Sequence, residues 1–96
     1  MATNHWRTKE TKKLFNAILR LKNEAETAKF FRDLCTLEEL SEMSKRWLAV
    51  QMLANGRSYR QIAEKTGLST TTVTRIAHWL NHGEGGYRLV LKRLNK

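Results

Sequence analysis

Residues 58–82 read SYRQIAEKTGLSTTTVTRIAHWLNH, and this stretch decides the fold. Ser58 with Gln61 three positions later has the pattern of a capping box, in which two side chains satisfy free backbone groups at a helix start. The turn that follows contains Gly67, which can adopt the positive φ of a sharp turn, and Ser69 is placed to cap a second helix. Two helices joined by a short turn with a glycine are typical of a helix-turn-helix, whose second helix lies in the major groove of DNA.

The second helix of this motif has an apolar side and a polar side. At 100° per residue, the apolar side is formed by Val73, Ile76, Ala77 and Leu80. Such helices enter the groove by their N-terminal end, so the residues predicted to contact bases are Thr70, Thr71, Thr72, Thr74 and Arg75. The residues of the supporting helix predicted to hold phosphates are Tyr59, Arg60 and Lys65.

The charge balance points to a polyanionic partner. The chain has 18 Lys and Arg against 9 Asp and Glu, so its formal net charge is +9. Residues 1–23 carry six basic and one acidic side chain and residues 57–96 carry eight and two, whereas residues 24–42 carry two and six. This segregation fits a positive face that binds double-stranded DNA. Two other interpretations stay open: a non-specific RNA or nucleoid binding module, and a helical adaptor that binds an acidic protein.

The rest of the chain also predicts helices, because it contains no proline and no alternating strand of useful length. Helices are expected over residues 8–22, from a capping box at Asn23 and Glu26 to about residue 35, over 37–55 before Gly56, and over 87–94. We therefore expect an all-α fold of about six helices in a single domain, residues 1–96. Residues 1–7 would form a flexible basic arm. A core of this size is small, so pairing with a second copy would add buried surface.

The order and spacing of several segments resemble those of the Trp repressor family over residues 30–94. The segments are Leu34-Cys35-Thr36-Leu37-Glu38-Glu39, Arg46, the helix-turn-helix with its string Thr72-Val73-Thr74-Arg75, and the loop 83–86 before the last helix. The resemblance is strongest to a Trp-repressor-like bacterial branch of the family. It implies an intertwined homodimer and a transcriptional regulator, most simply a repressor that reads a palindromic operator.

The resemblance extends only in part to the family's tryptophan pocket. It implies that Thr36, Arg46 and Arg75 stand where the family holds its corepressor. Four positions depart from the pattern: a glycine becomes Ile76, a small serine becomes Trp79, and two apolar wall positions become Asp33 and Cys35. The larger side chains would clash with free tryptophan, so the sequence disfavours tryptophan as corepressor. Another small effector stays open, and binding with no cofactor is favoured.

Other functional classes find little support in the sequence. No run approaches the roughly 20 apolar residues that a bilayer span needs, and the N-terminal residues lack a secretory pattern, so a cytoplasmic protein is expected. His78 and His82 lie four apart on one helix, but a third ligand is missing, so no metal site is expected. No catalytic arrangement of side chains is visible, and the protein is not expected to be an enzyme.

Overall fold

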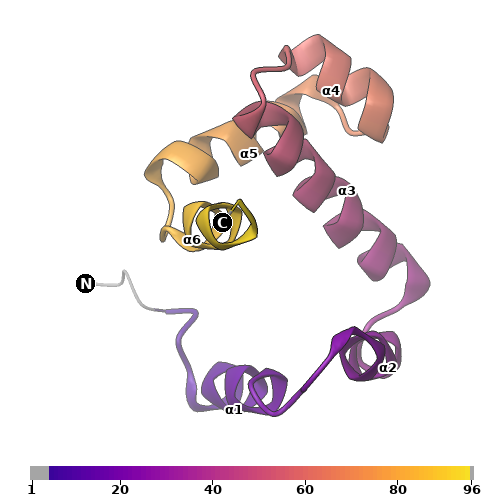
Figure 1. Cartoon of the computed structure of the whole chain (residues 1–96), viewed down its shortest axis with the longest axis vertical. Coiled ribbons are helices and arrows are strands. Elements are labelled where there is room, and N and C mark those ends of the chain that lie inside the picture. Colours follow the sequence, from indigo (N-terminus) through magenta and orange to yellow (C-terminus); the bar gives the residue numbers. More distant parts are fainter. Residues whose placement is uncertain (1–4, 96) are drawn as a thin grey trace. The chain divides into compact units, whose positions relative to one another are not determined.

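The computed structural model describes residues 5–95, and this part of the chain contains six α-helices and no β-strand. In order they are α1 (Lys9–Ile18), α2 (Glu24–Leu34), α3 (Leu37–Ala54), α4 (Tyr59–Thr66), α5 (Thr70–His82) and α6 (Gly86–Leu94) (Figure 1). The predicted all-α class is confirmed. The chain forms two compact units, Met1–Leu37 and Glu38–Lys96. Of the arm predicted over residues 1–7, residues 1–4 lie outside the described part.

In the first unit, α1 begins at a pair of threonines. Thr8 Oγ1 accepts a hydrogen bond from the Thr11 amide (3.1 Å), and Thr11 Oγ1 accepts one from the Thr8 amide (2.8 Å). The Thr11 hydroxyl also donates to the carbonyl oxygen of Trp6 (2.8 Å). The Trp6 ring lies edge-on to Phe15, with 6.3 Å between the ring centroids. Trp6 is therefore anchored on α1.

The prediction of a helix over residues 8–22 is wrong at its C-terminal end, because α1 ends at Ile18. The Arg20 amide donates to the carbonyl three positions back at 3.0 Å, the tighter pattern that often closes a helix. Glu26 then binds the Lys22 amide through its carboxylate (2.9 Å). Asn23 Oδ1 accepts from the Glu26 amide as predicted (2.9 Å). Because the Glu26 carboxylate binds Lys22, the predicted box at Asn23 is only half formed.

In the second unit, α3 ends at a glycine with a left-handed backbone. Gly56 has a φ of +79°. Its amide donates to the Leu53 carbonyl (3.0 Å), and the Arg57 amide donates to the Met52 carbonyl (3.0 Å). This pair of bonds is a Schellman motif, which satisfies carbonyls left free at a helix end.

The buried core of the second unit lies where α3, α4 and α5 meet. Its members are Ala49, Val50, Ile62, Leu68, Val73 and Ile76. Figure 1 shows α4 and α5 against the carboxyl-terminal end of α3. Burying a side chain such as Ile62 contributes about 1.5–3 kcal/mol. By contrast, α1, α2 and α6 contain no buried residue among those described. Most of the buried apolar side chains therefore hold α4 and α5 in place against α3.

Candidate nucleic-acid interface

The start of α4 is fixed by a complete capping box. Ser58 Oγ accepts a hydrogen bond from the Gln61 amide (3.1 Å), and Gln61 Oε1 accepts one from the Ser58 amide (3.0 Å). This confirms the predicted pairing of Ser58 with Gln61. The box orients the first turn of α4, where Tyr59 and Arg60 are exposed beside the unpaired amides of the helix N-terminus.

The turn between α4 and α5 depends on a glycine and on a buried threonine. Gly67 has a φ of +80°, so it supplies the left-handed turn predicted for it. Thr66 is the last residue of α4 and is 6% exposed. Its hydroxyl donates to the Ile62 carbonyl (2.7 Å) and accepts from the Leu68 amide (3.1 Å). The sequence pattern alone had indicated no role for Thr66. We call α4, this turn and α5, with the cap Ser58, the reading head.

In α5 the two predicted sides of the helix are present. Val73, Ile76 and Ala77 are buried, whereas Thr70, Thr71, Thr74 and Arg75 are exposed. Ser69 caps the helix by accepting from the Thr72 amide (3.0 Å). The exposed residues leave a row of hydroxyls and one guanidinium on the side opposite the core.

Two of the threonines predicted to contact bases already have hydrogen bonds within the helix. The Thr74 hydroxyl donates to the Thr70 carbonyl (2.9 Å), so its oxygen lone pairs remain available as acceptors. Thr72 is half-buried, and its hydroxyl accepts from Ser69 Oγ (3.0 Å). Thr70 and Thr71 are exposed at the N-terminal end of α5. The structure therefore distinguishes an outer set of threonines from Thr72, which supports the cap.

The three predicted phosphate contacts do not share one side of α4. Arg60 Nε lies 3.4 Å from Glu64 Oε2, one turn later on the helix. Lys65 comes five residues after Arg60, which at 100° per residue places it about 140° around the helix axis. Lys65 instead lines a groove between α3 and α4. Tyr59 and Arg60 thus lie together at the start of α4, and Lys65 lies apart from them.

Among the residues proposed for an effector pocket, Arg46 has a tryptophan as its neighbour. Arg46 Nε lies 3.5 Å from Glu42 Oε2, in an ion pair whose geometry is too poor for a hydrogen bond, so the buried Nε lacks a hydrogen-bond partner. The Arg46 guanidinium carbon is 6.0 Å from the centre of the Trp79 ring, a cation–π contact between α3 and α5. Arg75 is exposed on α5. Thr36 precedes α3 and belongs to the first unit.

The two histidines of α5 lie close to each other. The His78 and His82 rings have centroids 5.1 Å apart. Within residues 5–95, no group of three or more His, Cys, Asp or Glu side chains is arranged to hold a metal ion. In that same range, no helix is both long and apolar enough to cross a membrane.

Comparison with known proteins agrees with this architecture. Residues 9–95 match the family model of the Trp repressor protein. The chain is 38% identical over 96 residues to YerC of Bacillus subtilis (strain 168), covering all of this chain and 92% of that protein. A TrpR-like protein from Eubacterium eligens ATCC 27750 superposes with a TM-score of 0.90 at 43% identity, over 97% of this chain and 96% of its own.

A second solved structure, from Staphylococcus aureus, superposes with a TM-score of 0.89 at 36% identity, over 99% of this chain and 95% of its own. The match of the family model covers both units, including α1, α2 and the reading head. The resemblance inferred from the sequence is confirmed, and the chain belongs to the Trp repressor family.

Proposed function

We propose that the protein is a cytoplasmic, sequence-specific DNA-binding regulator that acts as a homodimer, most simply as a repressor that covers a promoter. Membership of the Trp repressor family supports a DNA-binding regulator rather than an enzyme. The observation that carries the proposal is the exposed row of Thr71, Thr74 and Arg75 on a helix whose opposite side forms the core. Hydroxyl and guanidinium groups are among those that hydrogen-bond to base edges in the major groove.

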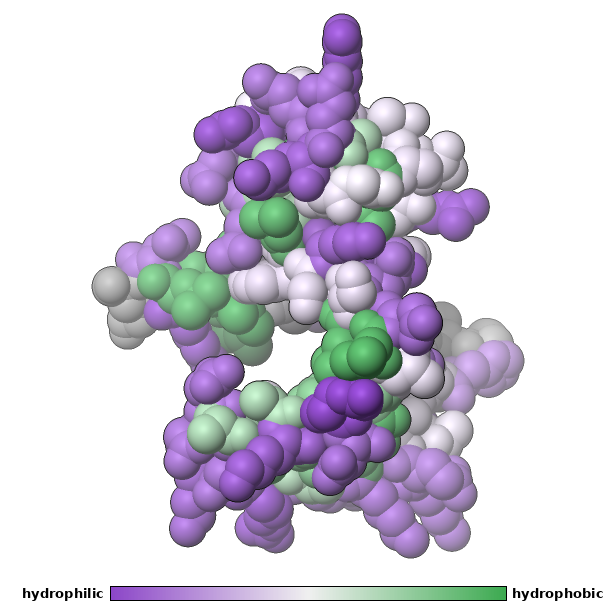
Figure 2. Space-filling view, turned by 90° about the vertical axis from the view of Figure 1, so that its right-hand side faces the viewer, coloured by the Kyte–Doolittle hydropathy of each residue, from purple (hydrophilic) through white to green (hydrophobic). Residues whose placement is uncertain are grey.

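The exposed apolar side chains of the single chain support a homodimer. None of the described residues of α1, α2 or α6 is buried, and Leu19 and Leu94 are 79% and 60% exposed. Figure 2 shows green apolar side chains open at the surface of the lone chain. Apolar surface this extensive is typical of an interface between subunits. A two-fold dimer presents two reading heads and therefore reads a palindrome.

We further propose that the protein binds DNA without tryptophan as a corepressor. The Trp79 indole already lies over the Arg46 guanidinium, and Ile76 stands where the family has a glycine. The Trp79 ring reduces the space for a second indole at Arg46, and the family resemblance implies that Ile76 fills space that the glycine leaves open. Thr36, Arg46 and Arg75 then act as a helix cap and as partners of phosphates or carboxylates.

Selection of binding sites from a random duplex library at about 0.15 M salt tests the proposal. We expect enrichment of a palindrome whose half-sites lie about one helical turn apart, on the order of 34 Å. Added tryptophan should leave both the enriched sequence and its affinity unchanged. Retention without enrichment would support non-specific binding, and no retention of duplex DNA would favour RNA or an acidic protein as the partner.

Single substitutions then test the roles of the residues. Thr71→Ala and Arg75→Ala should each relax the preference at one position of the site, with a loss of about 1–3 kcal/mol for the preferred base. Arg60→Ala should weaken binding to all sequences alike and lower the salt slope by about 1. Lys92→Ala, which removes the same charge from α6, serves as the matched control. Equal losses on every sequence from all three variants would contradict base reading by α5.

A further inference from the structure

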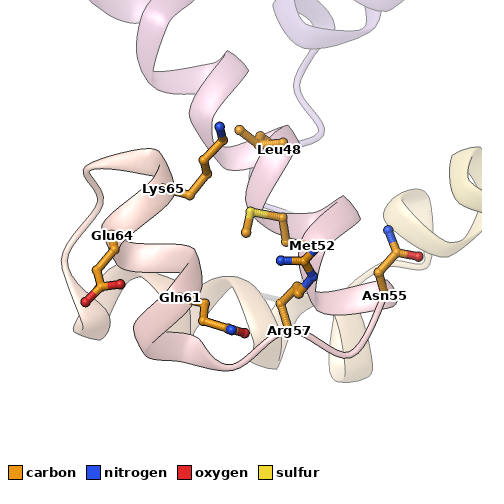
Figure 3. Close-up of a pocket in the computed structure, with 7 residues that line it drawn as sticks. All are labelled: Leu48, Met52, Asn55, Arg57, Gln61, Glu64 and Lys65. Atoms are coloured by element: carbon orange, nitrogen blue, oxygen red, sulfur yellow. The ribbon is translucent and has the colours of Figure 1, made fainter.

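A groove of about 580 Å³ lies in the second unit between α3 and α4 (Figure 3). Its lining residues are Leu48, Met52, Asn55, Arg57, Gln61, Glu64 and Lys65. We infer that this groove docks a short amphipathic peptide segment of a partner protein, with apolar side chains on one side and Asp or Glu beside them. This inference concerns a protein partner and does not depend on which DNA sequence the reading head binds.

The floor of the groove is apolar and adaptable. Leu48 and Met52 lie one turn apart on α3, so they share a side of that helix, and both are half-buried. The thioether of methionine is flexible and polarisable, a property that suits surfaces which bind peptide side chains. Leucine-type or aromatic side chains of a ligand would therefore find an apolar contact at this floor.

The charges around the floor select an acidic ligand. Lys65 lies at the Leu48 end of the groove, and Arg57 lies at the Met52 end (Figure 3). Glu64 is the acid among the lining residues, and its carboxylate is ion-paired with Arg60 and points away from Met52. Among residues 5–95, neither the Arg57 guanidinium nor the Lys65 ammonium has an ion-pair partner. Two uncompensated cations thus flank an apolar floor.

The groove shares one residue, Lys65, with the set predicted to contact DNA, and its other lining residues lie outside that set. Gln61 and Lys65 lie about 100–140° from Arg60 around the axis of α4, whereas Glu64, the ion-pair partner of Arg60, lies at the edge of the groove nearest to it. A sugar-phosphate backbone would offer anions to Arg57 and Lys65 but would leave Leu48 and Met52 against charged groups. An amphipathic peptide satisfies both the cations and the floor.

The shape of the groove favours a peptide over a small molecule. All of its lining residues come from the continuous stretch 48–65, which supplies two helical walls and the loop that joins them. Small-molecule sites usually enclose most of the ligand surface. A groove with two walls instead fits a helix or short segment that lays one side into it.

Methionine-methyl NMR on the full chain tests the inference. The chain has three methionines, Met1, Met43 and Met52. Met52 lines the groove, and Met43 is 42% exposed elsewhere on α3, so it serves as an internal reference. The probe is a helical peptide of about a dozen residues with leucine on one side and glutamate on the other. Its control is the same peptide with glutamine in place of glutamate.

We expect the glutamate peptide to shift the Met52 methyl signal saturably and to leave Met43 unchanged. The double variant Arg57→Ala/Lys65→Ala should bind this peptide about tenfold more weakly, because both cations are lost. The variant Lys92→Ala/Arg93→Ala removes the same charge from α6 and should bind the peptide with unchanged affinity. The glutamine peptide should also bind about tenfold more weakly.

Three results would overturn the inference. The first is that the Met52 signal does not shift at about 1 mM peptide, a concentration far above the dissociation constant of a specific peptide site. The second is a shift of Met43 in place of Met52, which would place the peptide on another apolar surface. The third is a shift of Met52 by duplex DNA that the peptide cannot displace, which would make the groove a phosphate site. Site selection with the reading head can succeed or fail independently of all three.

Discussion

Replacing Gly67 by alanine is expected to lower the free energy of unfolding by about 1 kcal/mol. Gly67 joins α4 to α5 with a φ of +80°, a conformation that costs an L residue about 1–2 kcal/mol. A Cβ at this position would meet no atom within 4 Å, so no steric clash adds to the backbone cost. Alanine also restricts the unfolded chain, which offsets about 0.4–1 kcal/mol of the loss.

Gly86 provides the matched control for this substitution. It begins α6 without a positive φ, and a Cβ there would also meet nothing within 4 Å. Gly86→Ala should therefore be neutral or stabilise by up to about 1 kcal/mol. Urea unfolding followed by circular dichroism, at one fixed protein concentration, measures both variants. Equal effects of the two alanines would refute the assignment of the cost to the left-handed turn, and Gly67→Asn should lose less than Gly67→Ala because asparagine tolerates that conformation.

Further substitutions probe the core, the cap, the indole contact and the interface. Ile62→Ala should cost about 2–5 kcal/mol in urea unfolding and Ile62→Val only about 0.5–1.5, since Ile62 is fully buried; similar values for both would contradict its place in the core. Ser69→Ala should lower the free energy of unfolding by about 1 kcal/mol, because it removes the acceptor of the Thr72 amide. The control is Ser41→Ala, at a serine inside α3 that caps no helix, and it should lower the free energy of unfolding by less. Trp79→Ala should make the affinity for the operator respond to added indole, because the space beside Arg46 is opened; fluorescence anisotropy measures this affinity. A variant with wild-type affinity that does not respond to indole would show that Trp79 does not exclude a small indole from this place. Leu94→Asp should shift the sedimentation equilibrium toward monomer, while Asn95→Asp should not; a Leu94→Asp variant that stays dimeric would place Leu94 outside the interface.

The reading head was predictable because its signals are local. A capping residue, its partner three positions later and a glycine at the turn act within one helical turn, so Ser58, Gln61 and Gly67 have the roles expected for them. The two sides of α5 follow from the helical period alone, and Val73 and Ile76 are buried as expected. The sequence thus predicted the elements and the orientation of α5 well.

Three other features depend on contacts that the sequence does not reveal. The Glu26 carboxylate could bind the amide of Asn23 or that of Lys22, and its preference for Lys22 accompanies the early end of α1. Thr66 lies one turn after Ile62 and shares its buried side of α4, but the sequence does not show that its hydroxyl is satisfied there by the Ile62 carbonyl and the Leu68 amide. Lys65 was predicted to hold phosphate from its charge alone, and only the position of α3 beside α4 places it at the groove. The predicted base and phosphate contacts remain predictions.

The buried apolar residues of the second unit all fall within residues 49–77, and this closeness along the chain has a kinetic consequence. Contacts between near neighbours in sequence close small loops, and domains built from them fold fast, in microseconds to milliseconds. The segment from the end of α3 to α5 can therefore acquire its structure on a single chain, and formation of the proposed homodimer would be a slower, concentration-dependent step. Amide hydrogen exchange should then divide the protein into a region that is protected at any dilution and a remainder whose protection depends on chain concentration. In the proposed homodimer, two newly made chains would thus associate after the α4–α5 segment of each has folded.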